Sequence, residues 1–507
     1  MINQKQFKLL FFLLFLFFST IHFYQLSNQH WSGFLDQDLM IIYNSLLINS
    51  GYEQEYRDHP AFTTFLINSL FYRIFNFLFN YSNDLDLLLK SENINNSFQI
   101  YFIISRIVNF SLNILLVFLF SKIIKSLKIE RYLRYLICLI FIISIGFISS
   151  LFLLRSENVS LLFLSLSIYL ILSGTNKKNL NFFLSGISLS FAMLAKIQII
   201  FLATYIILLI PHLSFKKESI DKKNLLDNYF ILSFVLIILT FFIFQFYIQN
   251  FPRFEQNQYL DPIIFFIGLI GILIFFNYKG KFKKNIIYLS SLINGFAFVV
   301  IVLLFLDKFD ILELNHFILL RLTNPFHYMT EFTGDMANGP VDINYLIQSF
   351  IKFFSEYNFN LIELFLILSL FAINIKSKNY FFMIFFIFVI NTFVMNFRYL
   401  PTYHLYYIFI YLIFFSILLK MLKFNLSLKI VNFAVLIFFI NSINFFFIKD
   451  HNYNFKKIFS RDVGFINICK ELQHGIKPNT YENIEYIQYY HKKFDNRFLK
   501  KICKEII

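Results

Sequence analysis

Charged residues are scarce in this sequence. Only 15% of its 507 residues are Asp, Glu, Lys or Arg, whereas soluble domains average about 25%. Hydrophobic residues make up 58% of the chain, and Phe alone occurs 76 times. This composition excludes an ordinary soluble globular domain.

Several common site patterns are also missing. The three cysteines, Cys138, Cys469 and Cys503, lack the spacing of a metal site. A disulfide between Cys469 and Cys503 stays open as an alternative to two free thiols. No Gly-rich phosphate loop follows a strand, so no nucleotide-sugar site is predicted. No small-residue cleavage site follows the first apolar run, 9–18, which we therefore interpret as a retained membrane span.

Long apolar runs are what the sequence has in abundance. Clear examples cover residues 133–154, 229–248, 263–276, 380–396 and 430–448. A helix needs about 20 apolar residues to cross a bilayer. Backbone groups in hydrocarbon must be satisfied within their own segment, so such runs are expected to be helices. The sequence predicts an all-α polytopic membrane protein.

The basic residues indicate how the chain is threaded. The net charge of +15 could suggest a nucleic-acid partner, but Lys and Arg sit between the apolar runs, as topology determinants do. Most of them face the cytoplasm if helix 61–79 lies in the membrane interface instead of crossing. About thirteen spans of membrane length then follow. They are 9–26, 98–121, 133–153, 158–173, 182–195, 197–211, 229–249, 262–277, 286–306, 358–375, 380–396, 402–420 and 430–448.

This topology divides the chain into two parts. Residues 1–448 form a transmembrane catalytic domain with two long outer loops, 27–97 and 307–357. Loops of such length are usually functional or disordered. Residues 449–507 form a small polar tail, which the odd number of spans places on the outer face.

The first outer loop is rich in ionisable residues. Asp36 and Asp38 follow the first span directly, and Arg57, Asp58 and His59 precede Pro60. A carboxylate at the membrane surface suits a general base that takes a proton from an acceptor hydroxyl. The alternative is that these acids are simply solvated. Asp58 and His59 make an incomplete ligand set for a divalent cation, so no cofactor is predicted and a cation stays an open alternative.

Several short motifs follow one another in order along the chain. They are Asp36-Gln37-Asp38, Tyr43, Gly51 and Asp58-His59-Pro60, then Arg106, Arg155-Ser156-Glu157, Ala195-Lys196 and Arg398-Tyr399-Leu400-Pro401. This set resembles the GT-C superfamily of glycosyltransferases, in the branch of aminoarabinose–lipid A transferases and protein O-mannosyltransferases. Ser156 replaces a proline of the family pattern, and the last motif is one residue shorter. Between residues 220 and 380 only the hydropathy is similar.

The resemblance implies a GT-C-like fold and a polyprenyl-phosphate-linked sugar donor. An acceptor hydroxyl on a glycan, lipid or protein would attack the anomeric carbon with inversion. Asp36 would be the catalytic base and Asp38 its near alternative. Arg57, Arg155, Lys196 and Arg398 would bind the donor phosphate. The remaining expected substrate contacts are Asp58, His59, Arg106, Glu157 and Tyr399.

The same resemblance implies a bacterial inner membrane, an active site facing the periplasm and a role in the cell envelope such as lipopolysaccharide biosynthesis. Three other readings stay open. A transporter or flippase of a lipid-linked glycan would also need many spans, although no two-fold hydropathy repeat is evident. A non-catalytic assembly protein would not depend on Asp36. An O-antigen polymerase or ligase would depend on the 307–357 loop. Each membrane-depth charge alone could also be a snorkelling side chain.

Overall fold

The computed structural model describes residues 4–33, 38–55, 61–173, 178–197, 282–314, 404–422 and 491–506, and a few single positions beyond them. These residues form helices and turns, with no strand among them. The all-α architecture is thus confirmed for the described ranges. The spans predicted at 229–249, 262–277, 358–375, 380–396 and 430–448 lie outside them, so the count of about thirteen stays a prediction.

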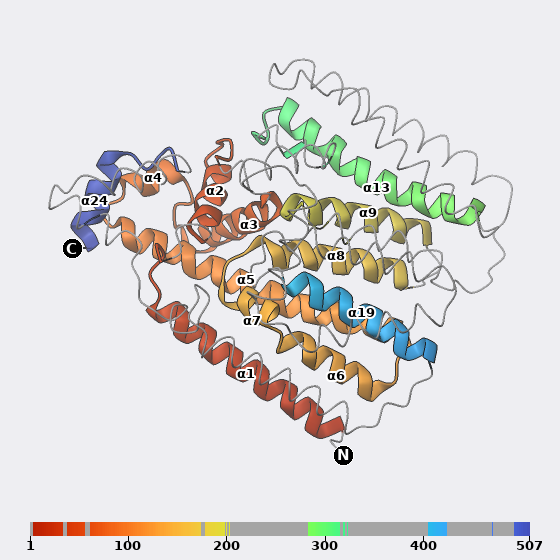
Figure 1. Cartoon of the computed structure of the whole chain (residues 1–507). Helices are drawn as coiled ribbons and strands as arrows, with labels where there is room; N and C mark the ends of the chain where they lie inside the picture. The colour runs from red at the N-terminus through yellow and green to blue at the C-terminus, as the bar shows by residue number, and fades with distance from the viewer. Residues whose placement is uncertain are drawn as a thin grey trace, which may run out of the picture.

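Long helices make up the main body of the molecule. In Figure 1 they run side by side, with α13 outermost, then α9, α8 and α5, which is also the order in which they contact one another. Their bounds agree with predicted spans to within a few residues. They are α1 (Gln4–Asn28), α5 (Ile94–Ser126), α8 (Ser156–Leu172), α9 (Lys178–Ala195), α13 (Phe282–Lys308) and α19 (His404–Leu422).

Several described helices are long and apolar enough to cross a membrane. Ile94–Ser126 and Ile287–Lys308 meet that standard, as does Phe62–Phe79, which is helix α3. In Figure 1, α3 lies with α2 (Met40–Asn49) and α4 (Leu85–Lys90) at one end of the bundle. That position is compatible with the predicted interfacial helix, whereas its length also allows a crossing. The interfacial placement of 61–79 therefore stays a prediction.

The predicted span 133–153 is a helix with a sharp break. It consists of α6 (Arg131–Ile142) and α7 (Ile145–Phe152), whose axes differ by 52°. Ser144 causes the break locally, since its Oγ accepts a hydrogen bond from Phe147 N at 3.2 Å and donates one to Phe141 O at 2.7 Å. A serine that caps a new helix ends the preceding one. The predicted apolar segment is therefore helical, but in two pieces.

Helices α9 and α13 approach each other closely through two glycines. A Cβ atom on Gly186 would overlap with the carbonyl oxygen of Leu292, and one on Gly295 with that of Phe183. Small residues allow such backbone contact, which drives helix association in lipid, where burial of apolar surface contributes little.

We expect Gly186→Ala to lower the free energy of unfolding by about 1–3 kcal/mol, because the added methyl group must push α9 and α13 apart. Denaturation of the purified protein in mixed micelles measures this loss. Ser188→Ala is the matched control, since the Ser188 hydroxyl bonds only within its own helix, to Leu184 O. Equal stability of the two variants would contradict the close approach.

Candidate active site

The first loop is organised by helix α2, which begins two residues after Asp38. Nine of its ten residues are buried, so the helix is packed inside the protein and not on its surface. It ends where Gly51 adopts a positive φ of 73°, a conformation that glycine accepts without strain. The buried position of α2 fixes the backbone next to Asp38.

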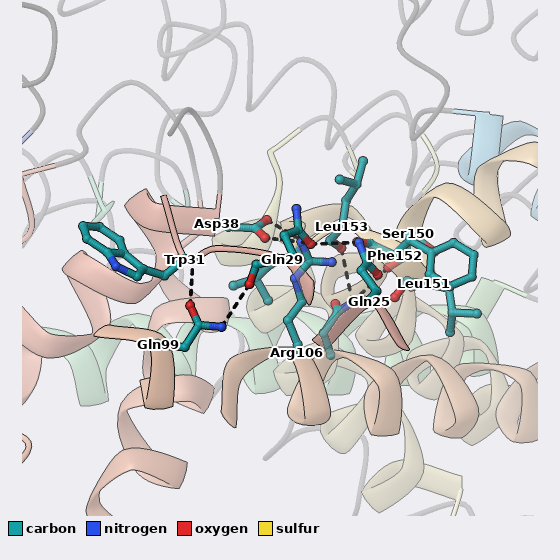
Figure 2. Close-up of polar contacts among 12 residues, drawn as sticks. Gln25, Gln29, Trp31, Asp38, Gln99, Arg106, Ser150, Leu151, Phe152 and Leu153 are labelled. Carbon is teal, nitrogen blue, oxygen red and sulfur yellow. Dashed lines mark hydrogen bonds and ion pairs between the residues drawn. The ribbon is translucent and has the colours of Figure 1, made fainter. Parts of the chain in front are cut away.

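Asp38 is completely buried and both of its carboxylate oxygens are engaged (Figure 2). Oδ2 forms an ion pair with Arg106 Nη2 from α5. Oδ1 accepts a hydrogen bond from the backbone N–H of Leu154 at 3.0 Å. Burial raises the pKa of the Asp38 carboxyl, while Arg106 and the Leu154 amide oppose the rise by stabilising the carboxylate.

Two glutamines at the end of α1 lie beside the Asp38–Arg106 pair, and one of them contacts the guanidinium. Gln29 Oε1 accepts from Arg106 Nη2 at 3.3 Å and from Gln25 Nε2 at 2.9 Å. Gln25 Nε2 also donates to Phe152 O at 3.1 Å, and Gln99 Nε2 donates to Gln29 O at 3.0 Å (Figure 2). The pair is thereby linked to α1, α5 and the end of α7, three elements far apart in the sequence.

The connection between α7 and α8 is extended and is held by asparagines. Asn109 Nδ2, on α5, donates to Ser150 O at 3.0 Å and to Leu153 O at 3.2 Å. Asn158 Nδ2, on α8, donates to Asn109 Oδ1 at 2.6 Å. These bonds satisfy carbonyl groups that the end of α7 leaves without partners in a helix. They also fix the backbone that presents the Leu154 amide to Asp38.

A second charged group lies directly after this connection. Glu157 Oε1, at the start of α8, is 3.3 Å from Lys196 Nζ and 3.9 Å from Arg155 Nη1. All three side chains are buried. Lys196 follows the last residue of α9, so the cluster joins the ends of two neighbouring helices. Two cations thus share one carboxylate in a water-poor site.

Five of the eleven predicted site residues are described, and they fall into two groups. Asp38 pairs with Arg106, and Arg155 and Lys196 meet at Glu157; the chain 154–155 joins the groups, since Leu154 binds Asp38. The other predicted site residues lie outside the described ranges: Asp36, Arg57, Asp58, His59, Arg398 and Tyr399. The described residues include no cluster of three or more His, Cys, Asp or Glu that could hold a metal ion.

The sequence reasoning missed the uncharged polar residues of the site. Gln25, Gln29, Asn109 and Asn158 are all buried and all contact the segment around the two charged groups. A signal for them existed, because amide side chains inside or at the ends of apolar spans are costly unless they have partners.

The comparison with protein families decides the class. Residues 11–255 match the model of the dolichyl-phosphate-mannose-protein mannosyltransferase family. This family is one of the GT-C superfamily. The match covers a little under half of the chain and includes both charged groups. No curated protein and no solved structure matches it.

The matched family indicates a multi-pass membrane glycosyltransferase of the mannosyltransferase type, with a polyprenyl-phosphate sugar donor. The resemblance noticed in the motifs is thereby confirmed at the level of the family. Arg398 and Tyr399 lie outside the matched segment.

Proposed function

We propose that this GT-C enzyme moves a sugar from a polyprenyl-phosphate donor to a hydroxyl acceptor on the outer face of the membrane, with inversion at the anomeric carbon. The observation that supports it most is the buried group of Arg155, Glu157 and Lys196. Burying two cations around one carboxylate is costly. Cations fixed in this way suit the binding of a lipid-linked phosphate.

The phosphate is the leaving group, so negative charge grows on it as the sugar departs. Fixed cations that face such charge stabilise the transition state more than the ground state. Arg155 offers a planar fork that fits phosphate oxygens, whereas Lys196 offers a compact point charge. In this proposal Glu157 holds both cations in place and keeps their side chains from turning away.

Asp36 and Asp38 receive different roles. Both oxygens of Asp38 are already bound, to Arg106 and to the Leu154 amide. A general base must reach the acceptor hydroxyl, whereas Asp38 is fully buried and ion-paired. We therefore assign proton removal to Asp36, two residues earlier, and assign to Asp38 the task of fixing the segment that carries Asp36. A backbone anchored so close to the base limits its motion, which favours a productive geometry.

Replacing Lys196 with methionine is expected to lower kcat by about 10²–10³-fold, since one fixed positive charge at the leaving group is lost. Turnover of a labelled polyprenyl-phosphate sugar by the reconstituted enzyme measures the effect. Lys125→Met is the control, because Lys125 is an exposed lysine at the far end of α5. Equal kcat in both variants would remove Lys196 from the donor site.

The linkage in the product tests the proposed mechanism. A direct displacement converts a donor of one anomeric configuration into a product of the other, which nuclear magnetic resonance of the purified product reads directly. Retention of configuration would contradict single displacement with Asp36 as base and would require a covalent or two-step route.

A further inference from the structure

The last residues of the chain dock on the first loop, far from them in sequence. In Figure 1 helix α24 (Asn496–Ile506) lies beside α4 and the start of α5, at the end of the bundle opposite the N-terminal end of α1. The contacts are side-chain and backbone interactions with α4, α2 and α5, together with an apolar contact and a disulfide.

The first contact is an ion pair backed by an aromatic ring. Lys493 Nζ lies 3.0 Å from Asp86 Oδ1 and 3.3 Å from the ring centroid of Tyr52. The Tyr52 hydroxyl donates to Asp86 Oδ2 at 2.5 Å. The Tyr52 hydrogen bond, together with Lys493, holds the pKa of the Asp86 carboxyl below its usual range. Asp86 thus stays ionised and available to Lys493 at neutral pH.

The second contact reaches helix α2 itself. Glu55 Oε2 accepts from the Lys492 backbone N–H at 2.7 Å and from the Tyr43 hydroxyl at 2.9 Å. The Tyr43 hydroxyl in turn accepts from the Lys493 N–H at 3.1 Å. Tyr43 is fully buried and lies one turn into α2, five residues after Asp38. The tail therefore touches the helix that follows the acidic segment.

The third contact is at the N-terminus of α5. The Glu505 carboxylate accepts from the backbone N–H groups of Ile94 and Asn95, at 3.3 and 3.0 Å. A negative charge there satisfies unpaired amides and complements the helix dipole. α5 also carries Arg106, the partner of Asp38. The tail thus contacts both helices that hold the Asp38–Arg106 pair.

An apolar seam and a disulfide complete the docking. Phe494 stacks on Phe498 with ring centroids 4.1 Å apart and meets the edge of Phe98 from α5. Cys503, within α24, forms a disulfide with Cys469. Of the two alternatives left open by the sequence, the structure has the disulfide. Such bonds persist in oxidising compartments, which agrees with a tail on the outer side.

We propose that the C-terminal tail is a positioning element for sugar transfer. The ion pair of Lys493 with Asp86 anchors a turn whose backbone amides, at Lys492 and Lys493, bind Glu55 and Tyr43. The tail thereby holds α2, and Asp38 two residues before it, in place. This inference rests on the proposed function. It assigns to Lys493 a role without contact to substrate, since its partners are Asp86 and Tyr52. Loss of the anchor leaves donor binding by the Arg155–Lys196 group intact and loosens α2 and the Asp38–Arg106 pair.

The test compares Lys493→Ala with the conservative Lys493→Arg and with Lys500→Ala, an exposed lysine of α24. We expect Lys493→Ala to lower kcat about tenfold to a hundredfold with little change in donor KM, because a small misplacement of a catalytic group costs that much. Amide exchange in α2 should rise while exchange in α13 stays unchanged. Lys493→Arg should restore kcat, and Lys500→Ala should behave as wild type. Cys503→Ser releases α24 from Cys469. It should lower kcat and raise amide exchange in α2, as Lys493→Ala does.

Wild-type kcat in both Lys493→Ala and Cys503→Ser would overturn the inference, whatever the exchange in α2 shows. A rise of donor KM without loss of kcat would also overturn it, since that pattern belongs to a donor-binding role. If the wild type itself transfers no sugar, the proposed function falls and this inference with it. The two failures are therefore distinct.

Discussion

Asp36→Asn is expected to lower kcat by about 10²–10⁴-fold while the protein keeps its fold, because asparagine cannot take the proton of the acceptor hydroxyl. The amide is nearly isosteric with the carboxylate, so donor binding should change little. Single-turnover transfer from a labelled polyprenyl-phosphate sugar measures the chemical step apart from product release. Thermal unfolding of the same preparation shows whether the variant is intact.

Glu53→Gln is the matched control for this variant. It removes one carboxylate from the same loop, and Glu53 is a partly exposed residue outside both charged groups. It should transfer sugar at the wild-type rate. Transfer at a wild-type rate by Asp36→Asn would show that Asp36 is not the base, and Asp38 would then be the next residue to test.

Arg106→Leu is expected to lower the free energy of unfolding by about 3–5 kcal/mol, because it leaves the buried carboxylate of Asp38 without its cation. Arg106 is 1% exposed and Asp38 is fully buried, so water cannot compensate. Denaturation in mixed micelles, followed by circular dichroism, measures the loss. Reduced yield of folded protein in the membrane is the expected companion effect.

The double variant Asp38→Asn with Arg106→Leu tests whether the lost stability comes from the unpaired Asp38 carboxylate. Replacing both partners removes the uncompensated carboxylate, and the amide oxygen of the new side chain can still accept from the Leu154 N–H. We expect the double variant to recover much of the stability lost in Arg106→Leu. If it is as unstable as the single variant, the pair is not what holds the first loop to α5.

Much of the fold could be predicted from the apolar runs. Segments of bilayer length must be helical, and α5, α8, α9, α13 and α19 lie where the runs indicated. The break between α6 and α7 could not be predicted from hydropathy. Hydropathy measures apolar content and does not detect the capping hydroxyl of Ser144. Ser144 changes the mean of the run very little, although it redirects the helix by 52°.

The site was only partly open to the same reasoning. Arg106, Arg155, Glu157 and Lys196 stood out because charges at membrane depth are rare and need partners. Their partners could not be read from spacing, since Asp38 and Arg106 are 68 residues apart and Glu157 meets Lys196 across two helices. The docking of the tail on the first loop was also invisible, because Lys493 and Asp86 are 407 residues apart and look like ordinary surface charges.

We propose that the protein transfers a sugar and does not merely move a lipid-linked sugar across the membrane. The most direct test reconstitutes the full chain in liposomes with a panel of labelled polyprenyl-phosphate sugars and membrane acceptors. We predict that label passes to an acceptor while unlabelled polyprenyl phosphate accumulates. If every donor stayed intact, the protein would not be a transferase under these conditions, which contradicts the proposed function. Intact labelled donor in the opposite leaflet would identify a flippase instead.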